Sequence, residues 1–233
     1  AIYLGLAMGS KWSALYFVIA FLILEFVLNK NLIRTIKVGL VSGSVYIASW
    51  FGWFNSSLGW DRNSKSNPIA SLIYYHKEML GFHTGLTEKH SYQANPWNWI
   101  VMGRPTSFYY QSPSGCGSKS CAQEVLALGT PILWWVGAIA LLFLIGVNIH
   151  NFAMRDFDIA SLLPFVGILA GYLPWFFFQK RTVFTFYAIA FQPFIILAIV
   201  LLAKFAYEYD ERLKYVIAIV VFVIAVNFAY FFP

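Results

Sequence analysis

Long apolar segments separated by short polar ones run along most of this 233-residue chain. A helix that crosses a membrane needs about 20 largely apolar residues. The segments are continuously apolar and carry internal prolines such as Pro164, which favours kinked helices over the alternating strands of a barrel. We therefore expect an all-α, polytopic membrane protein. Its six predicted transmembrane helices span roughly 8–28, 38–54, 126–148, 159–178, 182–203 and 214–232.

Two connections between the apolar segments stand out by their lengths. Only Gln179, Lys180 and Arg181 separate the fourth segment from the fifth, so the sequence predicts a tight helical hairpin there. The loop 55–124 is too long for a bare connection and too rich in aromatic residues to be disordered. We expect three parts: two transmembrane helices in 1–54, a structured extracytoplasmic loop in 55–124 and a four-helix transmembrane region in 125–233.

The composition supports a membrane protein and argues against a nucleic-acid partner. The chain is 60% hydrophobic and only 11% charged, with a mean hydropathy of +0.66, whereas soluble domains carry about 25% charged residues. In such a protein, a net charge of +6 is explained by basic residues at the loop ends, which are attracted to anionic lipid. No nucleic-acid motif is present. Because Ala1 opens inside an apolar run, we interpret the chain as part of a longer polypeptide.

The short loops carry unequal numbers of basic residues. The loop with Lys180 and Arg181 lies on the opposite side from the others, and the positive-inside rule places it, with the loop 55–124, outside the cytoplasm. This basic pair goes against the rule's preference, so it is a candidate for binding an anion, with snorkelling end residues as the alternative. The seven basic residues predicted on the cytoplasmic side are Lys30, Arg34, Lys37, Arg155, Lys204, Arg212 and Lys214.

The two cysteines fall in one small Gly/Ser-rich stretch, "PSGCGSKSCAQE". On the oxidising side of a membrane, Cys116 and Cys121 are expected to form a local disulfide. A two-cysteine zinc site is disfavoured, because the nearest histidine, His90, is far away in the sequence.

The stretch "SNPIASLIYYHKEMLGFH" predicts a helix with clear ends. Asn67 can cap it, Pro68 suits its first position and Gly81 can end it. Such a helix lies flat on the membrane surface or covers the ends of the spans. Its apolar face is predicted to hold Ile69, Leu72, Ile73, His76, Met79 and Leu80.

Three histidines, His76, His83 and His90, are spaced seven residues apart. On one unbroken helix they would align as metal ligands, but Gly81 and Gly85 argue against such a helix. Hydrogen-bonded interfacial histidines are the favoured interpretation, so no metal is expected, and a metal site is the alternative.

The stretch "HSYQANPWNWIVMGRPTSFYY" is too polar to cross a membrane and unusually aromatic. An aromatic belt at the membrane surface is one interpretation. However, Arg104 and Pro105 add a cation and a fixed turn, and aromatics beside an arginine suit a sugar or peptide above a lipid phosphate. The aromatic residues are Tyr92, Trp97, Trp99, Phe108, Tyr109 and Tyr110.

Four motifs in this order resemble the membrane C-terminal region of the protein O-mannosyltransferases, a family of GT-C glycosyltransferases, and its bacterial members in particular. They cover essentially the whole chain. They are "GLAMGSKWSALYF", "FHTGLTEKHSYQANPWNWIVMGRPTSFYY", "CGSKSCAQEVLALGTP" and "KRTVFTFYAIAFQPF".

The resemblance implies transfer of mannose from polyprenyl-phosphate-mannose to Ser and Thr hydroxyls of exported proteins, at the extracytoplasmic face of the plasma membrane. The expected partners are membrane lipid, the donor, the acceptor proteins and the secretion machinery. No cofactor is implied, because the lipid-linked mannose is a substrate. The alternatives are a GT-C glycosyltransferase with a lipid or glycan acceptor and a membrane transporter. The transporter is disfavoured because the spans hold few charges and no obvious internal repeat.

Such a displacement needs a carboxylate to activate the hydroxyl and cations to neutralise the leaving phosphate. The family's acidic pair lies in the first outer loop, upstream of this chain. Asp61, Glu78 and Glu88 match no part of that motif, so no catalytic residue is assigned here, and the chain alone is expected to be inactive.

The resemblance also assigns site residues. Lys11, Arg104 and Arg181 are the candidates for binding the donor phosphate, with interfacial anchoring as the alternative. Five residues of the loop are expected to shape the acceptor side: His83, His90, Tyr92, Trp97 and Trp99.

Overall fold

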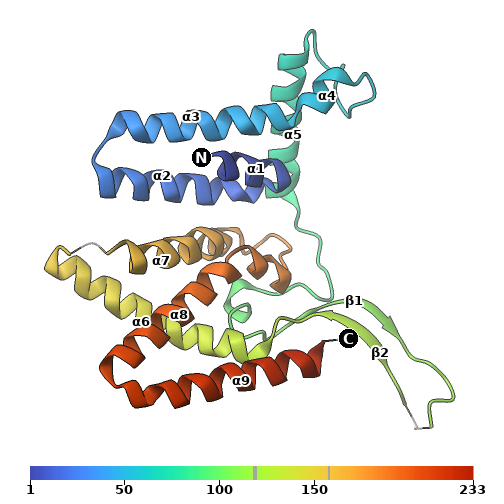
Figure 1. Cartoon of the computed structure of the whole chain (residues 1–233). Helices are drawn as coiled ribbons and strands as arrows, with labels where there is room; N and C mark the ends of the chain where they lie inside the picture. Colours follow the sequence, from blue (N-terminus) through green and yellow to red (C-terminus); the bar gives the residue numbers. More distant parts are fainter. Residues whose placement is uncertain (118–119, 157, 233) are drawn as a thin grey trace. The chain divides into compact units, whose positions relative to one another are not determined.

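The structure, a computed structural model, describes residues 1–117, 120–156 and 158–232 and is mainly helical (Figure 1). The chain divides into two compact units, residues 1–88 and 89–233, and each is described by itself. Within the described residues, six helical segments are long and apolar enough to cross a membrane, which confirms the all-α polytopic prediction. They are Trp12–Asn29, Leu32–Ser49, Pro131–Met154, Ile159–Phe178, Gln192–Tyr209 and Glu211–Phe231.

The first unit is built on a pair of long helices joined by a short turn. Lys30 adopts a left-handed conformation (φ 52°) and ends α2, and the side chain of Asn31 accepts a hydrogen bond from the backbone nitrogen of Arg34 at 3.0 Å and starts α3. Arg34 also pairs with Glu25, 2.5 Å between Nε and Oε1. The helices of unit 1 are α1 (Ile2–Ser10), η1 (Trp12–Ala14), α2 (Leu15–Asn29), α3 (Leu32–Ser49), α4 (Phe51–Asn55) and α5 (Pro68–Gly85).

The second span therefore begins at Leu32, six residues before its predicted start. The Asn31 cap starts the helix ahead of Arg34 and Lys37, whose charges led the sequence interpretation to place them in a loop. Long basic side chains at the end of a span can reach the membrane surface, so these charges are compatible with a helix.

Helices α1 and α3 pack closely at a glycine. A Cβ atom on Gly5 would lie 2.5 Å from the carbonyl oxygen of Ser42 and 2.6 Å from Cβ of Val45, so only glycine allows this approach. The buried hydroxyl of Ser42 donates to the carbonyl oxygen of Ala1 at 3.0 Å. The short α1 is thereby fixed against the middle of α3.

The capped helix predicted after the second span is present as α5. Its cap is Asn67, whose side chain accepts from the backbone nitrogen of Ala70 at 2.9 Å. The helix passes through the predicted end at Gly81 and continues to Gly85. The predicted apolar face is only partly packed within the unit, because Leu72 is buried whereas Ile69 is 67% exposed.

Among its described residues, the second unit contains four long helices, α6 to α9. The end of α6, the start of α7, the end of α8 and the start of α9 lie on the same side of the unit (Figure 1). Arg155 in a left-handed conformation ends α6, and Asp158 caps α7 by accepting from the backbone nitrogens of Ala160 and Ser161. The elements of unit 2 are η2 (Pro96–Asn98), β1 (Thr106–Gln111), β2 (Gln123–Ala127), α6 (Pro131–Met154), α7 (Ile159–Tyr172), η3 (Leu173–Phe178), η4 (Thr185–Ala190), α8 (Gln192–Tyr209), η5 (Glu211–Leu213) and α9 (Lys214–Phe231).

The core of unit 2 lies between α6, α7 and α8. Its fully buried side chains include Trp134, Leu144, Ile168 and Ile195. By contrast, α9 has no buried residue, although its sequence is apolar on all sides. A helix that is hydrophobic all round belongs in a membrane or a large core, so α9 is suited to contact lipid.

The predicted tight hairpin between the fourth and fifth spans is wrong. The connection runs over residues 179–191, because Thr182–Phe184 is not helical and η4 follows it. The fifth span begins at Gln192, ten residues after its predicted start. Residues 182–191 do not extend α8 toward its N-terminus. They instead pack against the loop that contains Ala94.

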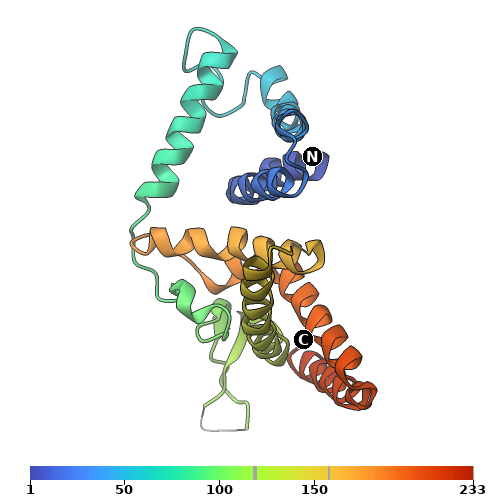
Figure 2. The same cartoon turned by 90° about the vertical axis from the view of Figure 1, so that its left-hand side faces the viewer.

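A two-stranded antiparallel ribbon, not predicted from the sequence, precedes α6. Its register shifts between Ser107 and Tyr109, and both views show it projecting away from the four helices (Figures 1 and 2). Cys116 and Cys121 are disulfide-bonded in the stretch between the strands, with their Cα atoms 6.4 Å apart. Because β2 takes up residues to Ala127, the third span begins at Pro131 and not at 126.

Candidate functional site

The loop 89–105 folds onto the connection 179–191 in unit 2, and we call the surface that they form the platform. The backbone nitrogen of Ala94 donates to the carbonyl oxygen of Val183 at 2.9 Å. The hydroxyl of Tyr172, at the end of α7, donates to the carbonyl oxygen of Pro96 at 2.9 Å. The platform therefore joins two segments that are far apart in the sequence at one end of the four helices.

Trp99 is the buried centre of the platform. Its side chain is fully buried, and its indole nitrogen donates to the carbonyl oxygen of Ala94 at 2.9 Å. Its ring lies 5.8 Å from Trp175 and 6.0 Å from Tyr187, centroid to centroid. Trp99 was predicted to shape the acceptor side, but the structure places it beneath the surface, where it holds the loop in position.

The two arginines assigned to the donor phosphate both lie on the platform. The guanidinium of Arg104 is exposed and donates to the carbonyl oxygen of Ser91 at 2.7 Å. The guanidinium carbon of Arg181 lies 5.5 Å from the ring centroid of Trp175, within the range of a cation–π contact. Arg104 is therefore at the surface, whereas Arg181 is half-buried.

The charges of the platform are all of one sign. The two segments contain no Asp or Glu. A surface with this composition favours an anion such as a phosphate, and it offers no carboxylate to act as a base. Its four basic residues are Lys89, Arg104, Lys180 and Arg181.

Besides Trp99, three of the predicted acceptor-side residues lie in the loop of the platform: His90, Tyr92 and Trp97. His90 accepts a hydrogen bond at Nδ1 from the backbone nitrogen of Tyr92, 3.1 Å away, and its ring packs 5.2 Å from Phe184. Trp97 is 67% exposed, with its ring edge-on to Phe176 at 4.6 Å. Trp97 is therefore available to a ligand, in contrast to Trp99 two positions later.

Lys11 and His83 belong to unit 1. Lys11 is exposed between α1 and η1, at the start of the first span. His83 lies in the last turn of α5, with its ring 5.6 Å from Phe82. The structure thus groups Arg104, Arg181 and His90 with the platform, while Lys11 and His83 are parts of the other unit.

Unit 1 contains an aromatic cluster around His76 that the sequence analysis missed. Nδ1 of His76 lies 2.7 Å from the carbonyl oxygen of Leu72 and must donate to it, so Nε2 accepts from the hydroxyl of Tyr46 at 2.5 Å. Edge-on or tilted rings surround the imidazole, those of Trp12, Tyr46, Trp50 and Tyr75. These rings come from η1, α3, the turn after α3 and α5, so their proximity gave no signal in the sequence.

The histidines do not form a metal site with one another in the described structure. Helix α5 ends at Gly85, so His90 is not on the helix that carries His76 and His83. Within the described residues, no group of three or more His, Cys, Asp or Glu side chains is placed to hold a metal ion.

The known proteins that this chain resembles in sequence are named as protein mannosyltransferases. A polyprenol-phosphate-mannose–protein mannosyltransferase of Mycobacterium tuberculosis is 29% identical over 99% of this chain, and one of Mycolicibacterium smegmatis is 30% identical over 99%. In both cases the match covers 52% of the relative, so the chain spans about half the length of these curated proteins. Dolichyl-phosphate-mannose–protein mannosyltransferase 5 of Saccharomyces cerevisiae is 27% identical over 47% of this chain and 15% of its own. No solved structure gives a significant match.

A family model described as the C-terminal four-transmembrane region of protein-O-mannosyltransferase matches residues 68–233. This range contains α5, the platform, the ribbon and the four long helices of unit 2. The match covers more than half of the chain and agrees with the resemblance found in its motifs. The chain therefore belongs to the protein-O-mannosyltransferase family.

Proposed function

We propose that the protein transfers mannose from a polyprenyl-phosphate-mannose donor to Ser or Thr hydroxyls of acceptor proteins, and that this chain supplies its C-terminal membrane part. The names of the mycobacterial relatives support this donor and a protein acceptor. The proposal includes a multi-pass location in the plasma membrane with the platform on the extracytoplasmic face. The distribution of basic residues at the turns supports that orientation.

The observation that carries the proposal is the sign of the charge on the platform. When a hydroxyl attacks the anomeric carbon of mannose, negative charge develops on the departing phosphate. Arg104 and Arg181 lie outside the six candidate spans, and we propose that they meet the phosphate of a membrane-anchored donor there. In this role they bind the donor and stabilise the leaving group.

The platform does not supply the base for this reaction. Its two segments carry no carboxylate, and its one histidine, His90, uses Nδ1 to accept a backbone hydrogen bond. Following the family resemblance, we propose that the acidic pair of the family's first outer loop supplies the carboxylate that activates the acceptor hydroxyl. We propose that the exposed ring of Trp97 contacts the acceptor side, since aromatic rings bind sugars and peptides well.

The test is a transfer assay with the full-length protein in membranes. Labelled polyprenyl-phosphate-mannose is supplied with a Ser/Thr-rich peptide, and a peptide with Ala at those positions is the matched control. The proposal predicts mannose on the first peptide only. Label that enters a lipid or a glycan but neither peptide would instead identify a glycosyltransferase with another acceptor.

A further inference from the structure

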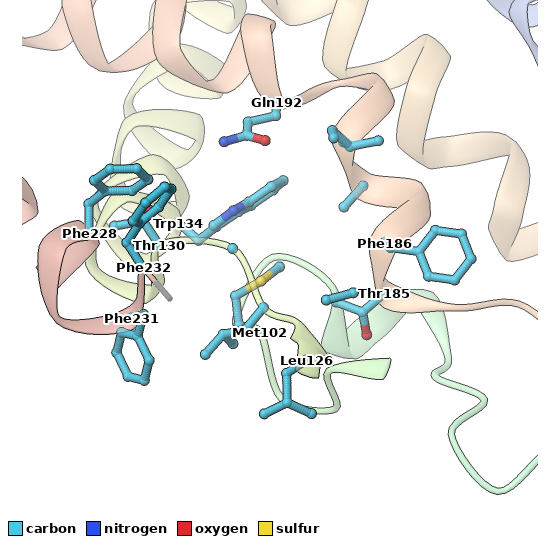
Figure 3. Close-up of a pocket in the computed structure, with 15 residues that line it drawn as sticks. Met102, Leu126, Thr130, Trp134, Thr185, Phe186, Gln192, Phe228, Phe231 and Phe232 are labelled. Carbon is cyan, nitrogen blue, oxygen red and sulfur yellow. The ribbon is translucent and has the colours of Figure 1, made fainter. Parts of the chain in front are cut away.

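A pocket of about 390 Å³ lies in unit 2 between the start of α6, the start of α8, the end of α9 and the base of the ribbon (Figure 3). Most of the residues that line it are apolar or aromatic, and polar atoms also form a substantial part of its surface. It lies where three of the candidate membrane spans begin or end, a position that corresponds to the interface between hydrocarbon and water when these helices cross a membrane. Its labelled apolar residues are Met102, Leu126, Phe186, Phe228, Phe231 and Phe232.

A buried donor in the wall of this pocket has no partner. Trp134 is 2% exposed, and its Nε1–H makes no hydrogen bond with any described residue. Figure 3 shows its ring between Gln192 and Met102. Buried donors are nearly always hydrogen-bonded, so this one points to an acceptor supplied by a bound molecule.

Gly129 and Met102 lie close to this N–H. A Cβ atom on residue 129 would lie 2.3 Å from Nε1 of Trp134, so only glycine allows the backbone this close approach. The sulfur of Met102 would lie 3.2 Å from the same Cβ position. Methionine side chains are unbranched and flexible, so Met102 can turn aside to admit an acceptor atom.

The chemistry of the lining selects the ligand. None of the described lining residues is charged, and the polar side chains other than Trp134 are Thr130, Thr185 and Gln192. A phosphate would be buried without a cation, which is unfavourable. An isoprenoid chain carries no hydrogen-bond acceptor except at its phosphate end. An ester carbonyl joined to an acyl chain is both neutral and an acceptor.

We propose that this pocket binds a membrane glycerolipid. An acyl chain lies against the aromatic wall formed by the end of α9, and an ester carbonyl accepts a hydrogen bond from Nε1 of Trp134. The amide of Gln192, which reaches into the pocket from the other side of the ring, provides a second hydrogen-bonding group for the glycerol region. None of the described lining residues is a cation, although Met102 and Thr185 belong to the platform segments, so the pocket adjoins the platform. Lipid binding at this pocket goes beyond the proposed mannosyl transfer.

The test compares two lipids that differ only in their carbonyl groups. The protein is purified from membranes, delipidated in detergent and titrated with diacyl or diether phosphatidylglycerol, and retained lipid is measured by native mass spectrometry. The diacyl lipid is expected to bind about tenfold more tightly, the factor that corresponds to one net hydrogen bond. Equal retention of the two lipids by the unsubstituted protein would overturn the proposal without any variant.

Variants then locate the site. Trp134→Phe keeps a ring but removes the N–H, so it is expected to abolish the preference for the diacyl lipid, while Trp97→Phe, outside the pocket, is expected to keep it. A Trp134→Phe protein with the full preference would place the lipid elsewhere and contradict the proposal. The proposal would also be contradicted if polyprenyl phosphate displaced the diacyl lipid from the unsubstituted protein but not from the Trp134→Phe protein. The ligand of the pocket would then be a phosphate lipid.

Discussion

The hydroxyl of Thr185 donates a hydrogen bond to the carbonyl oxygen of Arg104, 81 positions earlier in the chain. This contact ties the loop that carries one cation of the platform to the connection that carries Arg181. Thr185 is almost fully buried, so water cannot replace the lost partner easily. The relative position of the two cationic segments therefore depends on a neutral residue.

Replacing Thr185 by Val tests this dependence. The variant keeps the shape of the side chain but leaves the carbonyl oxygen of Arg104 without its partner, which is expected to cost about 1–3 kcal/mol in the free energy of unfolding. Thermal unfolding in detergent measures the change. Thr185→Ser retains the hydroxyl and serves as the control. If the Val variant is as stable as the unsubstituted protein, the hydrogen bond does not hold the platform.

Two tryptophans of the platform are expected to respond in opposite ways. Trp99→Ala removes a fully buried ring and is expected to destabilise the protein by about 3–5 kcal/mol. Trp97→Ala removes an exposed ring with one aromatic neighbour, so its cost is expected to be about 1 kcal/mol or less. Unfolding and peptide mannosylation are measured together. A stable Trp97→Ala protein with an unchanged KM for the peptide would remove Trp97 from the acceptor side.

The contact between α1 and α3 gives a prediction for unit 1. Gly5→Ala places a methyl group against Ser42 and Val45 and is expected to cost about 1–3 kcal/mol, because neither the backbone nor the neighbouring helix can yield easily. Gly43→Ala is the matched control, since nothing lies within 4 Å of its Cβ position. The control is expected to be neutral or slightly stabilising. Equal effects of the two substitutions on thermal unfolding would show that α1 does not pack as described.

The proposed orientation is open to a labelling experiment. Cys116→Ser leaves Cys121 as the one thiol of this chain. In full-length protein without other cysteines, a maleimide that cannot cross membranes is expected to label this thiol from outside intact cells. The control variant lacks both native cysteines and carries a single cysteine in place of Glu211, at the α8–α9 turn. This cysteine is expected to be labelled only after the cells are lysed. The reverse pattern would place the platform in the cytoplasm.

The sequence predicted the number of spans because membrane helices need long apolar runs that little else in a chain resembles. It placed their ends less well where local interactions decide them. The cap at Asn31 starts α3 among charged residues, and the platform draws Thr182–Phe184 out of a segment that reads as helix. In each case a hydrogen bond, from Arg34 to the side chain of Asn31 or from Ala94 to Val183, sets where the helix begins, although the run of apolar residues indicates another position.

The ribbon and the platform were harder to predict than the helices. In the strand Thr106–Gln111 four of six side chains are exposed, so no alternation of polar and apolar residues reveals a buried face. The contrast between Trp97 and Trp99 is likewise absent from the sequence, because it depends on which ring meets the connection 179–191. The motif predicted the same acceptor-side role for both tryptophans, whereas the structure buries Trp99 and exposes Trp97.

The central claim is that Arg104 and Arg181 bind the donor phosphate, and donor kinetics of arginine variants test it most directly. Mannosyl transfer to a Ser/Thr-rich peptide is measured for full-length protein carrying Arg104→Ala, Arg181→Ala or, as the control, Lys180→Ala. Each arginine variant is expected to remain folded and to lose roughly ten- to hundredfold in kcat/KM for the donor, the worth of a hydrogen bond to a charged group. The lysine variant is expected to lose much less. Unchanged donor kinetics in both arginine variants would contradict the account.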